Sequence, residues 1–342
     1  MLFCPPGMLP LLFQPLRLNL YSFDELFKGF VMSRPGSFAE TVDFRIYLQY
    51  VAAGRYAPTD YFTAMMEAVH DNAIREATED YLRSASARAA VAFMGGHDLA
   101  RNSPVYAAVA SLARQLARQG YLPISGGGPG AMEATHLGAL HQHSTPAALA
   151  RALRELGRIP DIPPRLQDIV AADGKIDRRL VARAHAWLLP AYRIRRRIRQ
   201  PGESLAIPTW LYGHEPTTAL ATQIAKYFQN SVREDRLLGV ATHGVIYVEG
   251  RAGTLQEIFQ DAALNCYRIL GDFSPMIFFG RRQWLETLPI VPVLKKLFKA
   301  GDFERYVRVT DDPGEILTFL AQRRRRESPS ERMVRLKPDR DH

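Results

Sequence analysis

The stretch ISGGGPGAMEATHLGA (residues 124–139) places four glycines between a short apolar run and a segment with the pattern of a helix. Gly126, Gly127, Gly128 and Gly130 carry no side chains, so the main-chain N–H groups of this turn can approach a ligand closely. The beginning of the following helix favours an anion at the same place. The turn is therefore predicted to bind phosphate, unless the glycines serve only a tight turn and helix–strand packing.

The residues on both sides of this turn have the alternating pattern of an α/β protein. The apolar stretch 89–96, the amphipathic segment 104–120 and the apolar stretch 121–125 predict a strand, a helix and a strand, which form a βαβ unit. The alternation continues downstream with predicted strands at 204–208, 244–250, 275–280 and 306–310 and predicted helices at 217–230, 254–268, 283–300 and 313–325. The expected fold is a doubly wound, mostly parallel sheet with helices on both faces, and such sheets bind ligands at the carboxyl ends of their strands.

Three segments differ from the α/β pattern of residues 86–325. Residues 1–85 are expected to form an N-terminal extension that is partly helical. Residues 141–203 are too long for an ordinary crossover between strands and are predicted to form a helical insert. Residues 326–342 are expected to be a basic and disordered tail.

The beginning of the extension has its own composition. Residues 1–31 are apolar and rich in proline, and two interpretations stay open: translation from Met32, or a true extension. No basic region precedes the apolar part, which argues against a secretory signal. Further along, residues 59–84 have apolar positions at helical spacing and predict a helix before the first strand.

The net charge of +9 is confined to two segments. Residues 192–200 contain five arginines and no acidic residue, and residues 323–342 contain eight basic and four acidic residues, so the rest of the chain is neutral. A general basic surface for nucleic acid is therefore not expected, and the run 192–200 is interpreted as a helix face or a contact for an acidic partner. Cys4 and Cys266 are too few and too far apart for a disulfide framework, which favours the reducing cytoplasm. No apolar stretch has the length of a membrane span, so no such span is predicted.

A second glycine turn follows another predicted strand, in YVEGRAGTLQEIFQDAALN (residues 247–265). Gly250, Gly253 and Thr254 lie in this turn, and Glu257 follows three residues later in the expected helix. Thr254 and Glu257 fit a capping box, in which the two side chains bond to free N–H groups of the helix. The alternative interpretation is a second phosphate-binding turn with a functional carboxylate beside it.

The two motifs together, GGGPGAMEA and then G-x-x-G-T-x-x-E, resemble those of the LOG-type proteins, whose usual signature is P-G-G-x-G-T-x-x-E and which are often mislabelled as lysine decarboxylases. The resemblance extends from about residue 90 to residue 284, excluding the insert. It implies a Rossmann-like fold and a cytoplasmic, usually dimeric phosphoribohydrolase, which cleaves nucleoside 5′-monophosphates to free base and ribose 5-phosphate. The resemblance implies that the nucleotide site lies near a dimer interface, and the insert follows the first glycine turn, so we expect a homodimer in which the insert covers the site.

The resemblance also assigns functional residues. The glutamate of the family motif falls on Glu257, which would stabilise charge on the ribose, and its phosphate-binding glycine and threonine fall on Gly253 and Thr254. The arginine that the family places shortly before this motif corresponds to Arg233, with Arg236 as a competitor. The other interpretation of Arg233 is an ordinary surface ion pair with a neighbouring acidic residue. The reaction requires neither a cofactor nor a metal ion.

Two positions inside the second motif depart from the family. Glu249 and Arg251 stand where the family has a proline and a glycine. The Arg251 side chain would either fill the space of the phosphate or bind it directly, because a guanidinium group matches phosphate in a bidentate fashion. Gly95 and Gly250 complete the expected nucleotide-binding residues.

Two alternative functions follow from these departures and from the charge pattern. Degenerate motifs also occur in relatives without activity, so a non-catalytic nucleotide- or cofactor-binding protein is the first alternative. A nucleic-acid-binding protein that uses the two arginine-rich segments is the second, and its affinity would fall steeply with salt.

Overall fold

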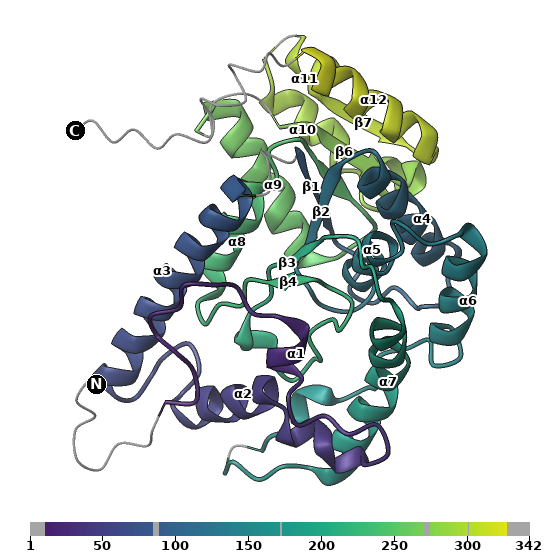
Figure 1. Ribbon diagram of the computed structural model, residues 1–342. Helices are drawn as coiled ribbons and strands as arrows, with labels where there is room; N and C mark the ends of the chain where they lie inside the picture. The colour runs from purple at the N-terminus through teal and green to yellow at the C-terminus, as the bar shows by residue number, and fades with distance from the viewer. Residues whose placement is uncertain (1–10, 85–88, 172, 270–273, 300, 327–342) are drawn as a thin grey trace.

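The computed structural model describes residues 11–84, 89–171, 173–269, 274–299 and 301–326. Its centre is a sheet of seven strands, all parallel, in the order β4-β3-β2-β1-β5-β6-β7 (Figure 1). The strands are β1 (Ala89–Met94), β2 (Tyr121–Ser125), β3 (Leu205–Ala206), β4 (Gln223–Ile224), β5 (Val245–Tyr247), β6 (Met276–Phe279) and β7 (Val307–Thr310). This arrangement confirms the predicted doubly wound, parallel α/β fold.

Helices cover both faces of the sheet, and its central strands are therefore buried along their whole length. Every residue of β1 and β2 is buried, as expected of parallel strands between two layers. The helices α4 (Pro104–Arg118) and α5 (Ala131–Leu140) pack on one face, and α8 (Asn230–Val240) and α9 (Ala252–Tyr267) pack on the other (Figure 1).

The order of the strands reverses between β1 and β5. From β1 the chain passes through α4 to β2 on one side, whereas β5 pairs with the other edge of β1 and is followed in the sheet by β6 and β7. The helices that follow β1 and β5 therefore leave toward opposite faces. A crevice opens between two such strand ends, and this is where open α/β sheets bind their ligands.

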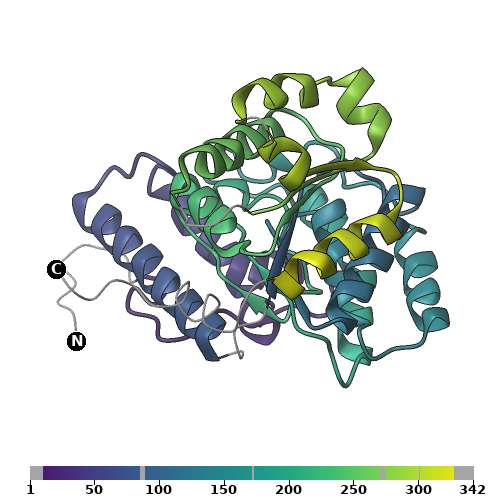
Figure 2. The same cartoon turned by 90° about the horizontal axis from the view of Figure 1, so that it is seen from above.

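The C-terminal part of the chain completes the sheet. After β6 come the π-helix η4 (Gln283–Thr287), α10 (Val291–Leu297) and α11 (Asp302–Tyr306), so the single helix predicted over 283–300 is divided. The last helix, α12 (Pro313–Arg326), lies beside α4 (Figure 2). Residues 327–342, most of the expected tail, lie outside the described residues, as does Cys4. Among the described helices, none combines the length and the apolar composition of a membrane span.

The prediction of a helix over residues 217–230 is wrong. Residues 217–229 form turns and the short strand β4, and α8 begins only at Asn230. The main chain of Ile224 exchanges two hydrogen bonds of 2.9 Å with Tyr21, which belongs to the N-terminal extension. Apolar residues recur in this stretch at helical spacing, but nearly all of residues 216–228 are buried by partners distant in the chain, and this tertiary packing overrides the local preference.

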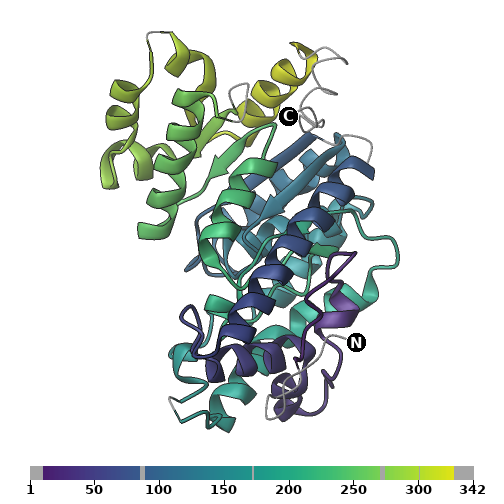
Figure 3. The same cartoon turned by 90° about the vertical axis from the view of Figure 1, so that its left-hand side faces the viewer.

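The N-terminal extension packs into the same hydrophobic core as the sheet. It contains α1 (Phe23–Leu26), the 3₁₀ helix η1 (Pro35–Glu40), α2 (Val42–Ala52) and α3 (Tyr61–Ser84). Tyr21 is buried, and its hydroxyl lies 2.8 Å from Nε2 of the buried His70 on α3. The helix α3 lies beside α8 (Figure 3), and Glu79 of α3 forms an ion pair with Arg236 of α8. Residues from 11 onwards thus contribute directly to the fold.

The segment between β2 and β3 is mostly helical. After α5 it contains α6 (Pro146–Leu156), the 3₁₀ helix η2 (Leu166–Asp168) and α7 (Arg178–Arg197). The arginine-rich run lies at the end of α7, where Arg196 pairs with Asp24 at 3.1 Å and Arg197 pairs with Glu155. This run is therefore a helix face that the protein's own acidic residues partly neutralise.

Candidate functional site

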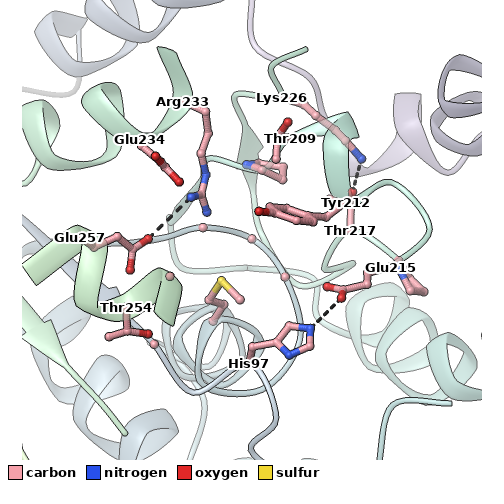
Figure 4. Close-up of a pocket in the computed structure, with 18 residues that line it drawn as sticks. His97, Thr209, Tyr212, Glu215, Thr217, Lys226, Arg233, Glu234, Thr254 and Glu257 are labelled. Atoms are coloured by element: carbon pink, nitrogen blue, oxygen red, sulfur yellow. Dashed lines mark hydrogen bonds and ion pairs between the residues drawn. The ribbon is translucent and has the colours of Figure 1, made fainter. Parts of the chain in front are cut away.

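A cavity of about 350 Å³ lies at the switch point of the sheet, beside the carboxyl ends of β1 and β2 (Figure 4). Eight of the eleven residues predicted for the site line this cavity: Gly95, Gly126, Gly127, Gly128, Arg233, Gly253, Thr254 and Glu257. Gly130, Gly250 and Arg251 lie next to it without lining it. The fold thus brings the two glycine turns and both residues assigned to catalysis into one cavity.

The first glycine turn is shaped by its contact with the loop after β1. Gly130 has a φ of +67° and precedes α5 as its N-cap. A Cβ atom at this position would lie 1.8 Å from the carbonyl oxygen of Gly96, so only glycine fits. The N–H of Ala131 donates a hydrogen bond of 3.0 Å to the same carbonyl. Gly130 therefore supports the turn from outside the cavity.

Buried polar side chains hold the same turn. The Gly127 N–H donates a hydrogen bond of 3.1 Å to the hydroxyl of Ser125, which also lies 2.8 Å from Nε2 of His136. Nδ1 of His136 lies 2.9 Å from the hydroxyl of Ser204 on the other side of the ring. Burial lowers the pKa of His136 to about 3, so the ring is neutral and bridges the two hydroxyls. The main chain of the turn is held in place by the protein itself.

The second glycine turn leads directly into α9. Arg251 is the N-cap of this helix, so Thr254 and Glu257 lie inside the helix, and the interpretation of these two residues as a capping box is wrong. Gly250 packs against Thr254, and a Cβ atom there would lie 2.1 Å from the threonine hydroxyl. A Cβ atom on Gly253 would meet nothing within 4 Å, because this residue borders the cavity.

Glu249 and Arg251 lie at the surface beside this turn. The Arg251 side chain is 87 % exposed, and its Nε lies 3.0 Å from Oδ2 of Asp98. Arg251 and Glu249 line a neighbouring cavity of about 750 Å³. The Arg251 side chain therefore does not fill the space between the two glycine turns, which was one of the two roles expected of it.

Arg233 and Glu257 come from two neighbouring helices and meet at the cavity (Figure 4). Arg233 is buried, its Nε donates a hydrogen bond of 2.8 Å to the Ile207 carbonyl, and its Nη1 lies 3.6 Å from Oε1 of Glu257. Because Arg233 is buried, its interpretation as a surface ion pair is wrong. The competitor, Arg236, pairs with Glu79 and does not line the cavity.

The environment of Glu257 changes its acidity. Its side chain is only 13 % exposed. This burial raises the pKa of Glu257 to about 7, although the positive charge of Arg233 acts in the opposite direction. A carboxyl group with this pKa exchanges between its neutral and charged forms near neutral pH, a property common in catalytic carboxyl groups.

Sequence reasoning missed the cavity wall formed by residues 208–217. This segment follows β3 and brings Thr209, Tyr212, Glu215 and Thr217 to the cavity. The insert 141–203, which was expected to cover the site, contributes none of the described lining residues of this chain. Between the predicted strand 204–208 and the predicted helix 217–230, the sequence has neither helical nor strand periodicity. This pattern predicts a loop but does not show that the loop borders the cavity.

His97 connects this wall to the loop after β1. Nε2 of His97 lies 2.7 Å from Oε1 of Glu215, and Nδ1 lies 2.9 Å from Oδ1 of Asp98. The hydrogen bond to Glu215, followed by the bond to Asp98, raises the pKa of His97 to about 9, so the ring is charged at neutral pH. Figure 4 shows this pair on the opposite side of the view from Arg233.

Neither the models of known protein families nor the curated protein sequences match this chain. Within the part of the chain that the structure describes, no group of three or more histidine, cysteine, aspartate or glutamate side chains could hold a metal ion. The cavity instead offers glycine-rich main chain, a guanidinium group and a carboxyl group. These groups suit a small phosphorylated molecule.

Proposed function

We propose that the protein is a LOG-type phosphoribohydrolase, which hydrolyses the N-glycosidic bond of nucleoside 5′-monophosphates to free base and ribose 5-phosphate. The observation that supports this best is the pair of Arg233 and Glu257, which shares one cavity with both glycine turns. The resemblance in the two sequence motifs points to the same residues. It also implies a cytoplasmic homodimer, and both properties belong to this proposal.

The two glycine turns would bind the phosphate. Residues 126–128 precede α5, and Gly253 and Thr254 lie in the first turn of α9, so the beginnings of two helices border the same cavity. Free N–H groups at the beginning of a helix attract an anion, and glycine lets the anion reach the main chain. Binding energy gained at the phosphate can then orient the reacting part of the nucleotide.

Glu257 would act on the ribose. When the N-glycosidic bond breaks, its electron pair stays with the base, and positive charge develops on the ribose at C1′. The carboxylate of Glu257 stabilises this charge and orients the water whose oxygen forms the new bond to C1′. Arg233 holds the phosphate or the ribose, so that C1′ lies against Glu257.

A panel of nucleoside 5′-monophosphates tests the proposal. The purified protein should release free base and an equal amount of ribose 5-phosphate from at least one member of the panel. Binding of monophosphates without release of base would favour the alternative, a non-catalytic nucleotide-binding protein. The altered motif positions Glu249 and Arg251 would then be the first to restore to the residues of the family. Absence of both binding and release would overturn the proposed function and this alternative together.

The rate of base release should depend on pH through Glu257. Its pKa is raised to about 7, and the ionised form is the one that stabilises the ribose, so kcat/KM should rise about tenfold between pH 6 and pH 8. His97, with a pKa of about 9, stays charged over this range and does not contribute. A pH–rate profile checks this, and an unchanged acidic limb in Glu257→Gln would assign the limb to another group.

A methyl group on Gly126 should displace the guanidinium group of Arg233. The Cβ atom of an alanine at this position would lie 2.1 Å from Nη2 of Arg233. Gly126→Ala should therefore lower kcat/KM about 100-fold, because a shift of about 1 Å in a positioning group has an effect of that size. Gly239→Ala is the matched control, since this glycine lies on α8 and its added Cβ atom would meet nothing within 4 Å. Equal rates in the two variants would mean that the position of Arg233 does not matter.

A further inference from the structure

Lys226 is a buried cation that sequence reasoning did not single out. It follows β4 by two residues, lines the cavity, and has a side chain that is only 1 % exposed. Its Nζ donates one hydrogen bond of 2.7 Å to Oδ1 of Asp43 and another of 2.7 Å to the hydroxyl of Thr217. An ammonium group has three N–H donors, and the third makes no hydrogen bond to the described residues. Nζ also lies 5.2 Å from the centre of the Trp210 ring, which contacts the cation but accepts no conventional hydrogen bond. One donor of a buried cation is therefore left for a ligand in the cavity.

The surroundings of Lys226 hold the ammonium group in one position. Oδ1 of Asp43, on α2, also accepts a hydrogen bond of 3.0 Å from Nε1 of Trp210, and Oδ2 accepts one of 2.9 Å from the hydroxyl of Thr217. Trp210 and Thr217 belong to the loop region that walls the cavity, so the N-terminal extension fixes both this wall and Lys226. A charged side chain that is bonded in this way cannot swing freely to other partners.

Lys226 lies away from the groups proposed for the phosphate and the ribose. Figure 4 shows Lys226 and Thr217 on one side of the view and Glu257 and Thr254 on the other. A nucleotide whose phosphate lies at the glycine turns and whose C1′ lies at Glu257 must extend its base toward another part of the cavity. The wall with Lys226 offers a donor on the side of the cavity away from Glu257.

We propose that Lys226 is a further catalytic residue beside Glu257 and Arg233, which donates the proton that the departing base requires; this inference rests on the proposed function. The C1′–N bond breaks with its electron pair going to the base, and the bond between C1′ and the water oxygen forms. The water gives one proton to the carboxylate of Glu257, and the base takes one proton from the ammonium group of Lys226. Exchange with solvent restores both groups, so the reaction consumes one water and releases no net proton.

The acidity of Lys226 agrees with this role. Burial lowers the pKa of the Lys226 ammonium group, although the carboxylate of Asp43 acts in the opposite direction. A lowered pKa makes the ammonium group a stronger proton donor toward a base that leaves with its electron pair. The hydrogen bond to Asp43 keeps the group in place between turnovers.

The test compares leaving groups in the Lys226→Met variant. Purine and pyrimidine bases leave as anions unless they receive a proton, whereas nicotinamide leaves nicotinamide mononucleotide as a neutral molecule and needs no proton. Lys226→Met should lower kcat about 100-fold or more for ordinary nucleoside monophosphates but less than about threefold for nicotinamide mononucleotide. If the wild type does not accept nicotinamide mononucleotide, kcat is plotted against the pKa of the leaving base, and the slope should be steeper in the variant.

A second variant separates catalysis from folding. Lys226→Met leaves the Asp43 carboxylate buried without its cation, so the double variant Asp43→Asn/Lys226→Met removes both charges together. In the double variant, kcat should depend on the leaving group in the same way as in Lys226→Met. Thermal unfolding of both variants shows whether they are folded. An equal loss of rate for all leaving groups, or an unchanged slope, would overturn the role of Lys226 while leaving the proposed function intact. A wild-type protein that releases no base would overturn both.

Discussion

Replacing Glu257 with glutamine is expected to lower base release about 100-fold or more and to leave nucleotide affinity almost unchanged. Glutamine has nearly the same shape, so the packing of α9 against α8 is retained. It has no negative charge, however, and cannot stabilise the positive charge that develops at C1′. The glycine turns, which would hold the phosphate, are not altered. Single-turnover base release and calorimetric titration with the nucleotide measure the two effects separately.

Asp235→Asn is the matched control for this variant. Asp235 is an exposed carboxylate on α8 that accepts a hydrogen bond from Gln260, and it does not line the cavity. Its replacement removes one negative charge from the same pair of helices, α8 and α9, but outside the cavity, and we expect the wild-type rate. Base release at the wild-type rate in Glu257→Gln would remove this residue from the mechanism.

Replacing Arg233 with methionine should lower kcat/KM by about 100- to 1000-fold, the size of effect seen when one charged or polar stabilising group is removed. The loss should appear in KM as well as in kcat, because Arg233 is proposed to hold the substrate. Removal of the guanidinium group also takes away the influence that lowers the pKa of Glu257. That pKa should therefore rise above about 7, and the acidic limb of the pH–rate profile should move to higher pH.

Arg236→Met serves as the control on the same helix. Arg236 pairs with Glu79 of α3 and lies outside the cavity, so its loss should affect stability more than rate. Arg233→Met also leaves the Ile207 carbonyl without its donor, which costs about 1 to 3 kcal/mol of stability. Thermal unfolding of both variants therefore accompanies the kinetics. An Arg236 variant that loses as much activity as the Arg233 variant would contradict the assignment.

The sequence by itself determined the framework and the two glycine turns. Apolar runs at 89–96 and 121–125 that alternate with an amphipathic segment predict parallel strands under helices, and the structure confirms the sheet. Glycines at the ends of these strands are a local signal, because a turn that brings main chain close to a ligand or to another loop excludes side chains. The resemblance then pointed to Arg233 and Glu257, and the structure brings both of them into the cavity.

Only the tertiary structure decided the rest of the site. Residues 217–229 have the spacing of a helix, yet they form turns and an added strand, because Tyr21 from the extension pairs with Ile224. Asp43 and Lys226 are separated along the chain by most of the sheet, and no local pattern relates them. Their contact exists because the extension packs on the wall of the cavity.

The acidity of Glu257 was decided in the same way. A carboxylate in the first turns of a helix is stabilised by the helix dipole, which lowers its pKa, but burial between α8 and α9 raises the pKa to about 7 instead. Periodicity and motifs depend on residues that are close together in the chain. Desolvation, charge pairing and the walls of a cavity depend on residues that meet only when the chain has folded, so the sequence alone does not display them.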